Sequence, residues 1–179
     1  MPLPPAAASP PCPLAVVDVQ YRGAGASAAC VVAAGWSDAV AIEERTAELA
    51  SVQPYQPGRF FERELPCILE VLGRVETPLS AIVVDGYVEL DPQGTPGLGG
   101  WLHQHFAGRY AVIGVAKTAY RGAGFAARVV RGGSVKPLFV TARGMAMEDA
   151  AGLVGAMHGA HRVPTLLARA DRLARNAAG

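Results

Sequence analysis

The sequence predicts an α/β fold in which a mixed β-sheet is flanked by helices. Three apolar segments joined by short glycine-containing turns come first, which is the pattern of an antiparallel meander. Apolar strands and amphipathic helices then alternate, which is typical of parallel strands with helical connections. The chain of 179 residues is 51% hydrophobic and 17% charged, so it can bury a core of ordinary domain size.

The first third of the chain predicts the three strands of the meander. Residues 14–20 form an almost unbroken apolar run, and residues 28–34 form another after the turn at 21–25. Residues 39–48 are the third predicted strand, after a turn of Gly, Trp, Ser and Asp. Short connections of this kind join neighbouring antiparallel strands.

A helix is predicted over residues 62–73, after a segment that cannot be regular structure. Residues 54–58 contain two prolines and a glycine, which interrupt helices and strands alike. Apolar residues recur on one side of the helix, and Pro66 is compatible only with its first turn. Glu64 is therefore expected near the amino end of the helix, where a carboxylate is favoured.

The remainder of the chain alternates between strands and helices. Residues 79–84 are apolar nearly throughout, which is typical of a strand covered on both faces. The segment 121–135 is rich in glycine and arginine and predicts a hairpin or a mobile loop. The other predicted elements are strands over 110–115 and 137–141 and helices over 98–106, 148–159 and 165–175.

The amino-terminal segment and the cysteines bear on localisation. Residues 1–13 are rich in proline and alanine and lack the features of a signal peptide, so we expect a flexible arm before a single domain over 14–179. No apolar run is long enough to span a membrane. The cysteines, Cys12, Cys30 and Cys67, fit neither a disulfide framework nor a zinc site. We expect a cytoplasmic protein, monomeric, whose cysteines act as small apolar side chains.

Charge is unevenly distributed, although the net charge is only +1. Residues 38–91 contain eleven acidic and four basic residues, whereas residues 92–147 contain seven basic residues and no acidic ones. If the fold gathers these basic residues, the resulting face suits a polyanion such as nucleic acid. If it does not, they are ordinary solvated side chains, and composition alone leaves both interpretations open.

Three acidic residues lie where metal-dependent phosphodiester chemistry would need them. Asp18 interrupts the first apolar strand, Asp85 follows the apolar run over 79–84, and Glu64 lies between them in the sequence. Burying carboxylates in valine-rich strands is costly unless a cation compensates for their charge. Mg²⁺ binds few carboxylates and completes its coordination with water and phosphate. The pattern predicts a Mg²⁺ site, and Mn²⁺ accepts the same oxygen ligands.

Five segments, in order along the chain, resemble the endonuclease V family of deoxyinosine 3′ endonucleases, which have an RNase H-like fold. The resemblance covers about residues 14–175 and depends on the combination of motifs, because each motif alone is a weak signal. The segments are Val17–Val19, Pro54–Gly58 with Glu64 nine residues after Tyr55, Ile82–Gly86, Ile113–Lys117 and Pro137–Val140.

This resemblance implies a metal-dependent endonuclease that hydrolyses a phosphodiester near a deaminated base, inosine, in DNA or RNA during nucleic acid repair. Asp18 and Asp85 correspond to direct metal ligands, and Glu64 to a ligand that acts directly or through water. Lys117 is expected to contact the scissile or the adjacent phosphate. The implied catalytic residues are therefore Asp18, Glu64, Asp85 and Lys117.

The resemblance also implies a nucleic-acid interface. Tyr55 belongs to a loop expected to enter the duplex, where a rigid aromatic ring between prolines can stack in place of a displaced base. The motif Tyr-Arg-Gly-Ala-Gly occurs at 21–25 and again at 120–124, either as two similar turns or as two backbone nests for phosphate. The further residues expected to bind nucleic acid are Pro57, Gly58, Gly86, Lys117, Arg121 and His103.

The chain departs from the family pattern at several histidines. After the last strand the family has Gly-His, an active-site histidine, where this chain has Arg143 and Gly144; Tyr87 and Asp91 replace two others. Loss of a group that assists proton transfer lowers a rate by roughly 10²–10⁴-fold. Arg143 is a candidate phosphate clamp in its place. Two hypotheses follow, a working nuclease and a catalytically impaired protein that binds nucleic acid; a third assigns the arm over 1–13 to assembly.

Overall fold

The computed structural model describes residues 12–121 and 123–177. Within them the chain forms seven strands and four α-helices. The predicted arm therefore lies almost wholly outside the described residues. In chain order the elements are β1 (Leu14–Arg22), β2 (Gly25–Ala33), β3 (Glu43–Leu49), α1 (Phe60–Leu72), β4 (Ala81–Asp85), α2 (Leu98–His105), β5 (Ala111–Ala116), the 3₁₀ helix η1 (Ala123–Phe125), β6 (Ala127–Val129), β7 (Leu138–Arg143), α3 (Met147–Ala156) and α4 (Thr165–Ala177).

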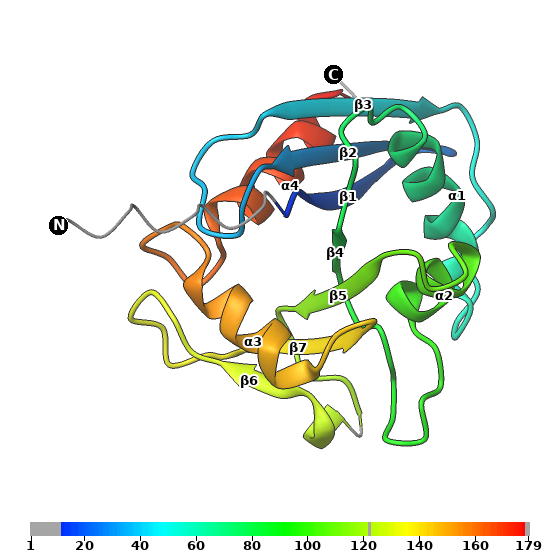
Figure 1. The fold of residues 1–179 in the computed structure, drawn as a ribbon. Helices are drawn as coiled ribbons and strands as arrows, with labels where there is room; N and C mark the ends of the chain where they lie inside the picture. Colours follow the sequence, from blue (N-terminus) through cyan, green and yellow to red (C-terminus); the bar gives the residue numbers. More distant parts are fainter. Residues whose placement is uncertain (1–11, 122, 178–179) are drawn as a thin grey trace, which may run out of the picture.

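The strands form one mixed sheet in the order β3-β2-β1-β4-β5-β7-β6 (Figure 1). The predicted antiparallel meander is confirmed in β1, β2 and β3, and β4 and β5 then lie parallel to β1. The sheet ends in an antiparallel pair, because β7 runs opposite to β5 and pairs with β6. The connection from β5 to β7 contains only η1 and β6, without the long helical crossover that a parallel return needs.

Helices cover both faces of the sheet. α1 and α2 pack on one face, and α3 and α4 pack on the other (Figure 1). Along β1, Ala15 and Val17 belong to the core beneath α1, whereas Leu14 and Val16 belong to the core beneath α4. Since side chains alternate along a strand, Asp18 follows Val16 toward α4.

The structure defines the start of the third strand and the elements within residues 121–135. The third strand begins at residue 43 rather than 39, because the preceding residues form a turn in which the Asp38 carboxylate accepts the Gly35 N–H at 2.8 Å. The segment 121–135, predicted as a hairpin or a loop, contains η1 and the short strand β6, which pairs with β7 as a hairpin.

α1 begins at Phe60, two residues earlier than predicted, and this changes the setting of Pro66 and Glu64. Pro66 is the seventh residue of the helix rather than part of its first turn. A proline there removes one backbone hydrogen bond, and the burial of Ile68 and Val71 against the sheet holds the helix together. Glu64 consequently lies in the second turn and is only 8% exposed.

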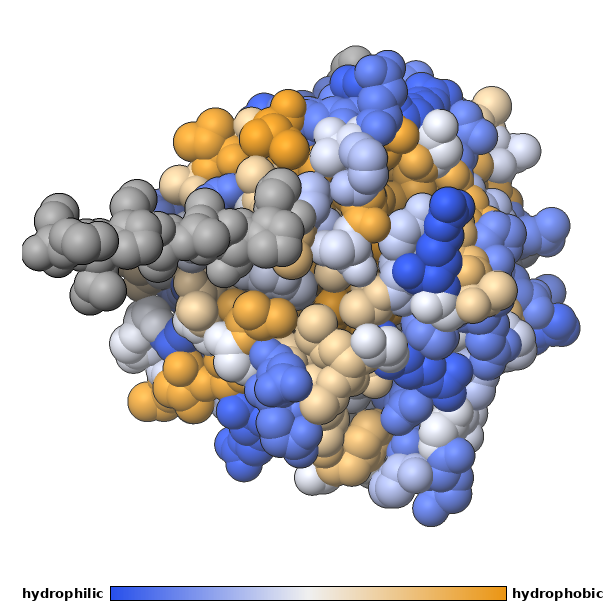
Figure 2. Space-filling view, viewed as in Figure 1, coloured by the Kyte–Doolittle hydropathy of each residue, from blue (hydrophilic) through white to orange (hydrophobic). Residues whose placement is uncertain are grey.

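The surface combines hydrophilic regions with small apolar patches. In Figure 2 two apolar patches lie at the left, where Figure 1 places the connections β2–β3 and β6–β7. These connections contain the exposed side chains Val40, Ile42, Val130 and Val135. No helix within the described part of the chain has the length and apolar composition to cross a bilayer.

Candidate functional site

Three of the predicted residues meet at the carboxyl ends of the parallel strands. The register pairs Val17 of β1 with Val84 of β4, so Asp18 and Asp85 occupy the next positions of the two strands. Lys117 directly follows β5, which neighbours β4 on its other side. The carboxyl ends of parallel strands lie at one edge of the sheet, which is the usual place for a ligand site in α/β proteins.

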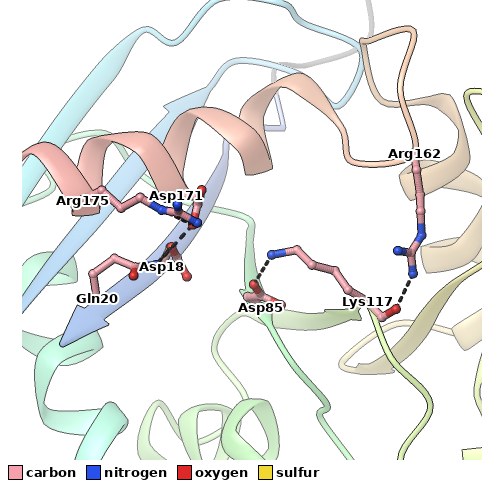
Figure 3. Close-up of polar contacts among 7 residues, drawn as sticks. All are labelled: Asp18, Gln20, Asp85, Lys117, Arg162, Asp171 and Arg175. Carbon is pink, nitrogen blue, oxygen red and sulfur yellow. Dashed lines mark hydrogen bonds and ion pairs between the residues drawn. The ribbon is translucent and has the colours of Figure 1, made fainter.

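Lys117 and Asp85 form an ion pair at this edge. Lys117 Nζ lies 2.6 Å from Asp85 Oδ2 (Figure 3). Burial by itself lowers the pKa of Lys117, but the hydrogen bond and charge of Asp85 outweigh burial, so the pKa is raised. The Arg162 guanidinium donates to the backbone carbonyls of Lys117 and Pro137 and so holds the backbone from which the amine extends.

Asp18 belongs to a second polar network, between β1 and α4. Gln20 Nε2 donates to Asp18 Oδ2 at 3.1 Å and to Asp171 Oδ1 at 3.2 Å (Figure 3). Arg175, one turn further along α4, donates to the same Asp171 oxygen at 2.9 Å. Burial raises the pKa of Asp18 to about 6; the Gln20 hydrogen bond opposes the shift, and the charges of Asp85 and Asp171 add to it.

Asp171 is a member of this cluster that the sequence analysis does not single out. It is the only acidic residue after Asp149. On α4 it lies beside the buried Ala170 and three residues before the buried Ala174, at the border of the apolar side. A single carboxylate at that border of an arginine-rich amphipathic helix is the signal by which the sequence could have identified it.

Glu64 approaches the same cluster from α1. Its Oε2 is buried and has no hydrogen-bond partner among the described residues. Burial raises the pKa of Glu64 to about 8, and the negative charges of Asp18 and Asp85 add to the shift. A buried polar oxygen without a partner is uncommon and costly, so it indicates a ligand for this carboxylate.

The acidic cluster of Asp18, Glu64, Asp85 and Asp171 fits a hard divalent cation. Within residues 12–121 and 123–177, no three His, Cys, Asp or Glu side chains are already arranged as a metal site. The unpaired Glu64 oxygen and the raised pKa values of Asp18 and Glu64, caused first by burial and then by neighbouring carboxylates, nevertheless indicate that a cation would stabilise these two side chains. An all-oxygen donor set of this kind suits Mg²⁺ or Mn²⁺.

A cavity of about 510 Å³ lies beside the acidic cluster. Glu64 and Asp85 contribute to its wall, together with Gly86, whose φ of +142° suits glycine. Phe61 and Trp101 also line it, and their rings are stacked, with centroids 4.7 Å apart and planes 16° from parallel. A cavity of this size, mostly apolar with a few polar groups at one end, suits a flat aromatic ligand. Two further rings of the lining belong to Tyr87 and Tyr120.

The loop of Tyr55 adjoins this cavity. Tyr55 is 62% exposed, and its ring contacts the edge of the Phe60 ring, with centroids 6.4 Å apart. Phe60 and Gly58 both line the cavity. Tyr55, Pro57 and Gly58 thus lie in the irregular segment predicted from the sequence, with an exposed aromatic ring next to the cavity.

Gly144 and His103 lie at the other end of the sheet. Gly144 directly follows β7, whose last residues pair with the beginning of β5. A Cβ on Gly144 would lie 3.0 Å from Ala111 Cα and 3.4 Å from His103 Nε2. Lys117 is at the opposite end of β5, roughly 20 Å away at the rise of an extended strand. A histidine at position 144 would therefore not reach Asp85, and His103 lies away from the acidic cluster.

Three of the seven basic residues in 92–147 have polar partners within the protein, and two of them, Arg131 and Arg143, are only partly exposed. Arg143, the candidate phosphate clamp, donates to Glu89 Oε1 at 2.9 Å and to the Gly94 carbonyl at 2.8 Å. Arg131 donates to four backbone carbonyls of the α3–α4 connection, and Lys117 pairs with Asp85. The other four, Arg109, Arg121, Arg128 and Lys136, are exposed.

Known proteins share this fold. The endonuclease V family model matches residues 7–148, whereas no curated protein sequence matches the chain. The crystal structure of endonuclease V from Streptomyces avermitilis has 29% identity and a TM-score of 0.75, over 95% of this chain and 83% of that chain. The catalytic domain of human endonuclease V has 21% identity and a TM-score of 0.78, with the same coverages of 95% and 83%.

A third similar structure contains nucleic acid. Endonuclease V from Ciona intestinalis, in complex with DNA containing an inosine followed by a ribo-adenosine, has 18% identity and a TM-score of 0.76. The similarity covers 94% of this chain and 86% of that chain. These likenesses confirm the predicted RNase H-like architecture of a mixed sheet between helices.

Proposed function

Because the chain belongs to the endonuclease V family, we propose that it is a metal-dependent endonuclease, which cleaves DNA or RNA near a deaminated purine such as inosine. The observation that carries the proposal is the acidic cluster beside an aromatic cavity, with one buried Glu64 oxygen unpaired. The Ciona intestinalis protein of the same fold was solved with inosine-containing DNA. We propose the same kind of substrate for this chain.

The residues of the site have distinct roles in this proposal. Asp18, Glu64, Asp85 and Asp171 would hold Mg²⁺ or Mn²⁺, whose chemistry is to ionise a water molecule and to neutralise charge on the phosphate. Lys117 leaves Asp85 for a non-bridging oxygen of the phosphate, where its positive charge stabilises the negative charge that develops during attack. The ion pair with Asp85 holds the amine at the edge of the sheet where the acidic cluster lies.

Recognition of the base is assigned to the cavity and the Tyr55 loop. A displaced purine would enter the cavity and lie among its aromatic rings, while its phosphate stays beside Lys117 and Asp85. Tyr55 would stack in the space that the base leaves in the strand. Pro57, Gly58 and Gly86 shape the backbone around this path, and the exposed Arg121 would contact phosphate.

The second candidate is an impaired relative that binds the same nucleic acid without cutting it. It is favoured by Tyr87, which occupies the position of a family histidine after Asp85 and Gly86. It is weakened by the position of Gly144, because the missing histidine there lies far from the acidic cluster.

We also propose a monomeric cytoplasmic protein. Cys30 and Cys67 are free and buried. Unpaired cysteines of this kind are at home in a reducing compartment.

The test is cleavage of an end-labelled oligonucleotide with a single deoxyinosine, in Mg²⁺ and in EDTA, by the wild-type protein and by Asp85→Ala. The same strand with adenine in place of hypoxanthine is the substrate control. A Mg²⁺-dependent cut near inosine that Asp85→Ala abolishes supports the nuclease. Binding of the inosine strand without a cut supports the impaired relative, and cleavage unchanged in Asp85→Ala contradicts the proposed site.

A further inference from the structure

The segment from Lys117 to Tyr120 is irregular, yet side chains from elsewhere hold its backbone at three points. Arg162 donates to the Lys117 carbonyl. The Tyr87 hydroxyl donates to the Thr118 carbonyl at 2.8 Å and accepts the backbone N–H of Tyr120 at 3.1 Å. One phenol oxygen therefore bridges both sides of the turn that follows β5, which restricts its conformation.

Tyr87 is well placed for this bridging. It comes two residues after Asp85, it is 9% exposed, and its ring packs against Ala116, Ala126 and Phe139. The side chain thus connects the end of β4 to the turn beyond the end of β5.

Tyr120 is the residue whose side chain this turn presents. Its ring is 49% exposed and lies 6.0 Å from the Tyr87 ring, at an angle of 53°. It lines the cavity that also contains the stacked Phe61 and Trp101. The backbone of Tyr120 is therefore held in place before a ligand arrives, and its exposed ring offers a flat surface for stacking.

We propose that Tyr120 is a specificity-determining residue that stacks on the displaced base, and that Tyr87 is a positioning residue that acts through it by fixing the turn. This inference rests on the proposed function, because the base is the ligand of the same cavity. A phenol at position 87 in place of the family histidine is then an adaptation of base recognition rather than a loss of chemistry.

The expected effects follow from the physics of stacking and of preorganisation. Removing an aromatic ring that stacks on a base weakens binding about 5- to 150-fold, corresponding to about 1–3 kcal/mol. Removing the Tyr87 hydroxyl removes both hydrogen bonds that hold the turn, and we expect it to weaken inosine binding about 2- to 12-fold, the equivalent of one net hydrogen bond. The Tyr87 effect should exist only while the Tyr120 ring is present, because Tyr87 acts through that ring.

The experiment is a double-mutant cycle on binding. The dissociation constants of fluorescent single strands with one deoxyinosine or one thymidine are measured in Ca²⁺, with a gel to verify that the strands remain intact. The proteins are wild type, Tyr87→Phe, Tyr120→Ala and the double variant, with Tyr120→Phe as the conservative replacement. Thermal unfolding of each variant shows that it is folded.

Three results together support the inference. Tyr120→Ala loses most of the preference for inosine over thymidine, Tyr120→Phe keeps most of it, and Tyr87→Phe weakens inosine binding in the wild type but not in the Tyr120→Ala background. Folded Tyr120→Ala with wild-type preference overturns it while leaving the proposed function intact. Equal Tyr87→Phe losses in both backgrounds overturn the positioning role. A wild-type protein without any inosine preference contradicts the proposed function itself.

Discussion

The two ends of the parallel strands differ in chemistry although the same strands build both. At the carboxyl ends, Asp18 and Asp85 lie beside Glu64. The pKa values of Asp18 and Glu64 are raised, and one buried Glu64 oxygen has no partner among the described residues. At the amino end of β5, Gly144 and His103 pack closely against backbone and ring atoms. The carboxyl ends therefore hold buried carboxylates that a cation would stabilise, whereas the amino end of β5 shows only close packing.

This difference decides which departure from the family pattern matters. A substitution is expected to affect chemistry only if it alters the carboxyl ends, and Gly144 is at the other end of β5. Tyr87, by contrast, follows directly on β4 and lines the cavity. The missing histidine at position 144 therefore gives no reason to expect an inactive protein.

The largest expected effect separates the two ends directly. Glu64→Gln keeps the shape of the side chain but removes a charge from the acidic cluster, so cleavage should fall by roughly 10²–10³-fold, the effect of removing one electrostatic contribution to the transition state. His103→Gln, at the other end, should stay within about twofold of wild type. Single-turnover cleavage rates measure both. Equal losses in the two variants would contradict the division between the ends.

Asp171→Asn should have the next largest effect. Asp171 shares Gln20 with Asp18 and completes the acidic cluster from α4. Its loss should weaken Mn²⁺ binding and cleavage by about 10- to 100-fold, as when a residue that supports or completes a metal site is replaced. Isothermal titration with Mn²⁺ and cleavage rates test this. Wild-type affinity in the variant would exclude Asp171 from the site.

The stability of the metal-free protein should fall as the pH rises. The folded pKa of Glu64, about 8, lies above its ordinary value of 4.5, so the folded state binds more protons between these values than the unfolded state. The contribution of Glu64 to stability is then full below about pH 4.5 and is lost as the pH rises through about 8, and that of Asp18 is lost near pH 6. Thermal unfolding in EDTA measures this decline, which Glu64→Gln should flatten. A decline of the same slope in Glu64→Gln would show that other groups cause it.

The smallest expected effect on activity comes from Gly144→Ala. Gly144 has φ +82°, and a side chain there meets Ala111, so the variant should lose about 1–2 kcal/mol of stability. Denaturant unfolding measures that loss. Cleavage per folded molecule should be unchanged, and a large decrease would place Gly144 in the site after all.

Much of the site follows from the local pattern of the strands. Asp18 interrupts an apolar run and Asp85 ends another. Parallel strands bring such residues to one edge of a sheet. Lys117 follows the same logic at the end of β5. These positions are predictable because strand order and direction determine them, and the motifs along the chain give the order.

The remaining features depend on tertiary contacts that no local pattern contains. Asp171 joins the cluster because α4 packs across β1. The hydrogen bond from Gln20 to Asp171 joins residues that are 151 positions apart in the sequence. The hydroxyl of Tyr87 finds Thr118 and Tyr120 only once β4 and β5 are neighbours. By sequence, Gly144 takes the place of a family histidine. The antiparallel direction of β7 puts Gly144 beside the amino end of β5, away from the acidic cluster. The extent of α1 differs from the prediction for a similar reason, since the burial of α1 outweighs the cost of Pro66.

The most direct test of the account is Mn²⁺ binding to the protein without nucleic acid, followed by the electron paramagnetic resonance signal of free Mn²⁺. Wild type and Gly144→Ala should bind Mn²⁺ with the same affinity, and Asp85→Asn should bind it at least about 10-fold more weakly. That result would show that the carboxyl ends hold a cation and that the amino end has no part in holding it. Binding that is equal in wild type and Asp85→Asn, or absent from all three proteins, would contradict the account.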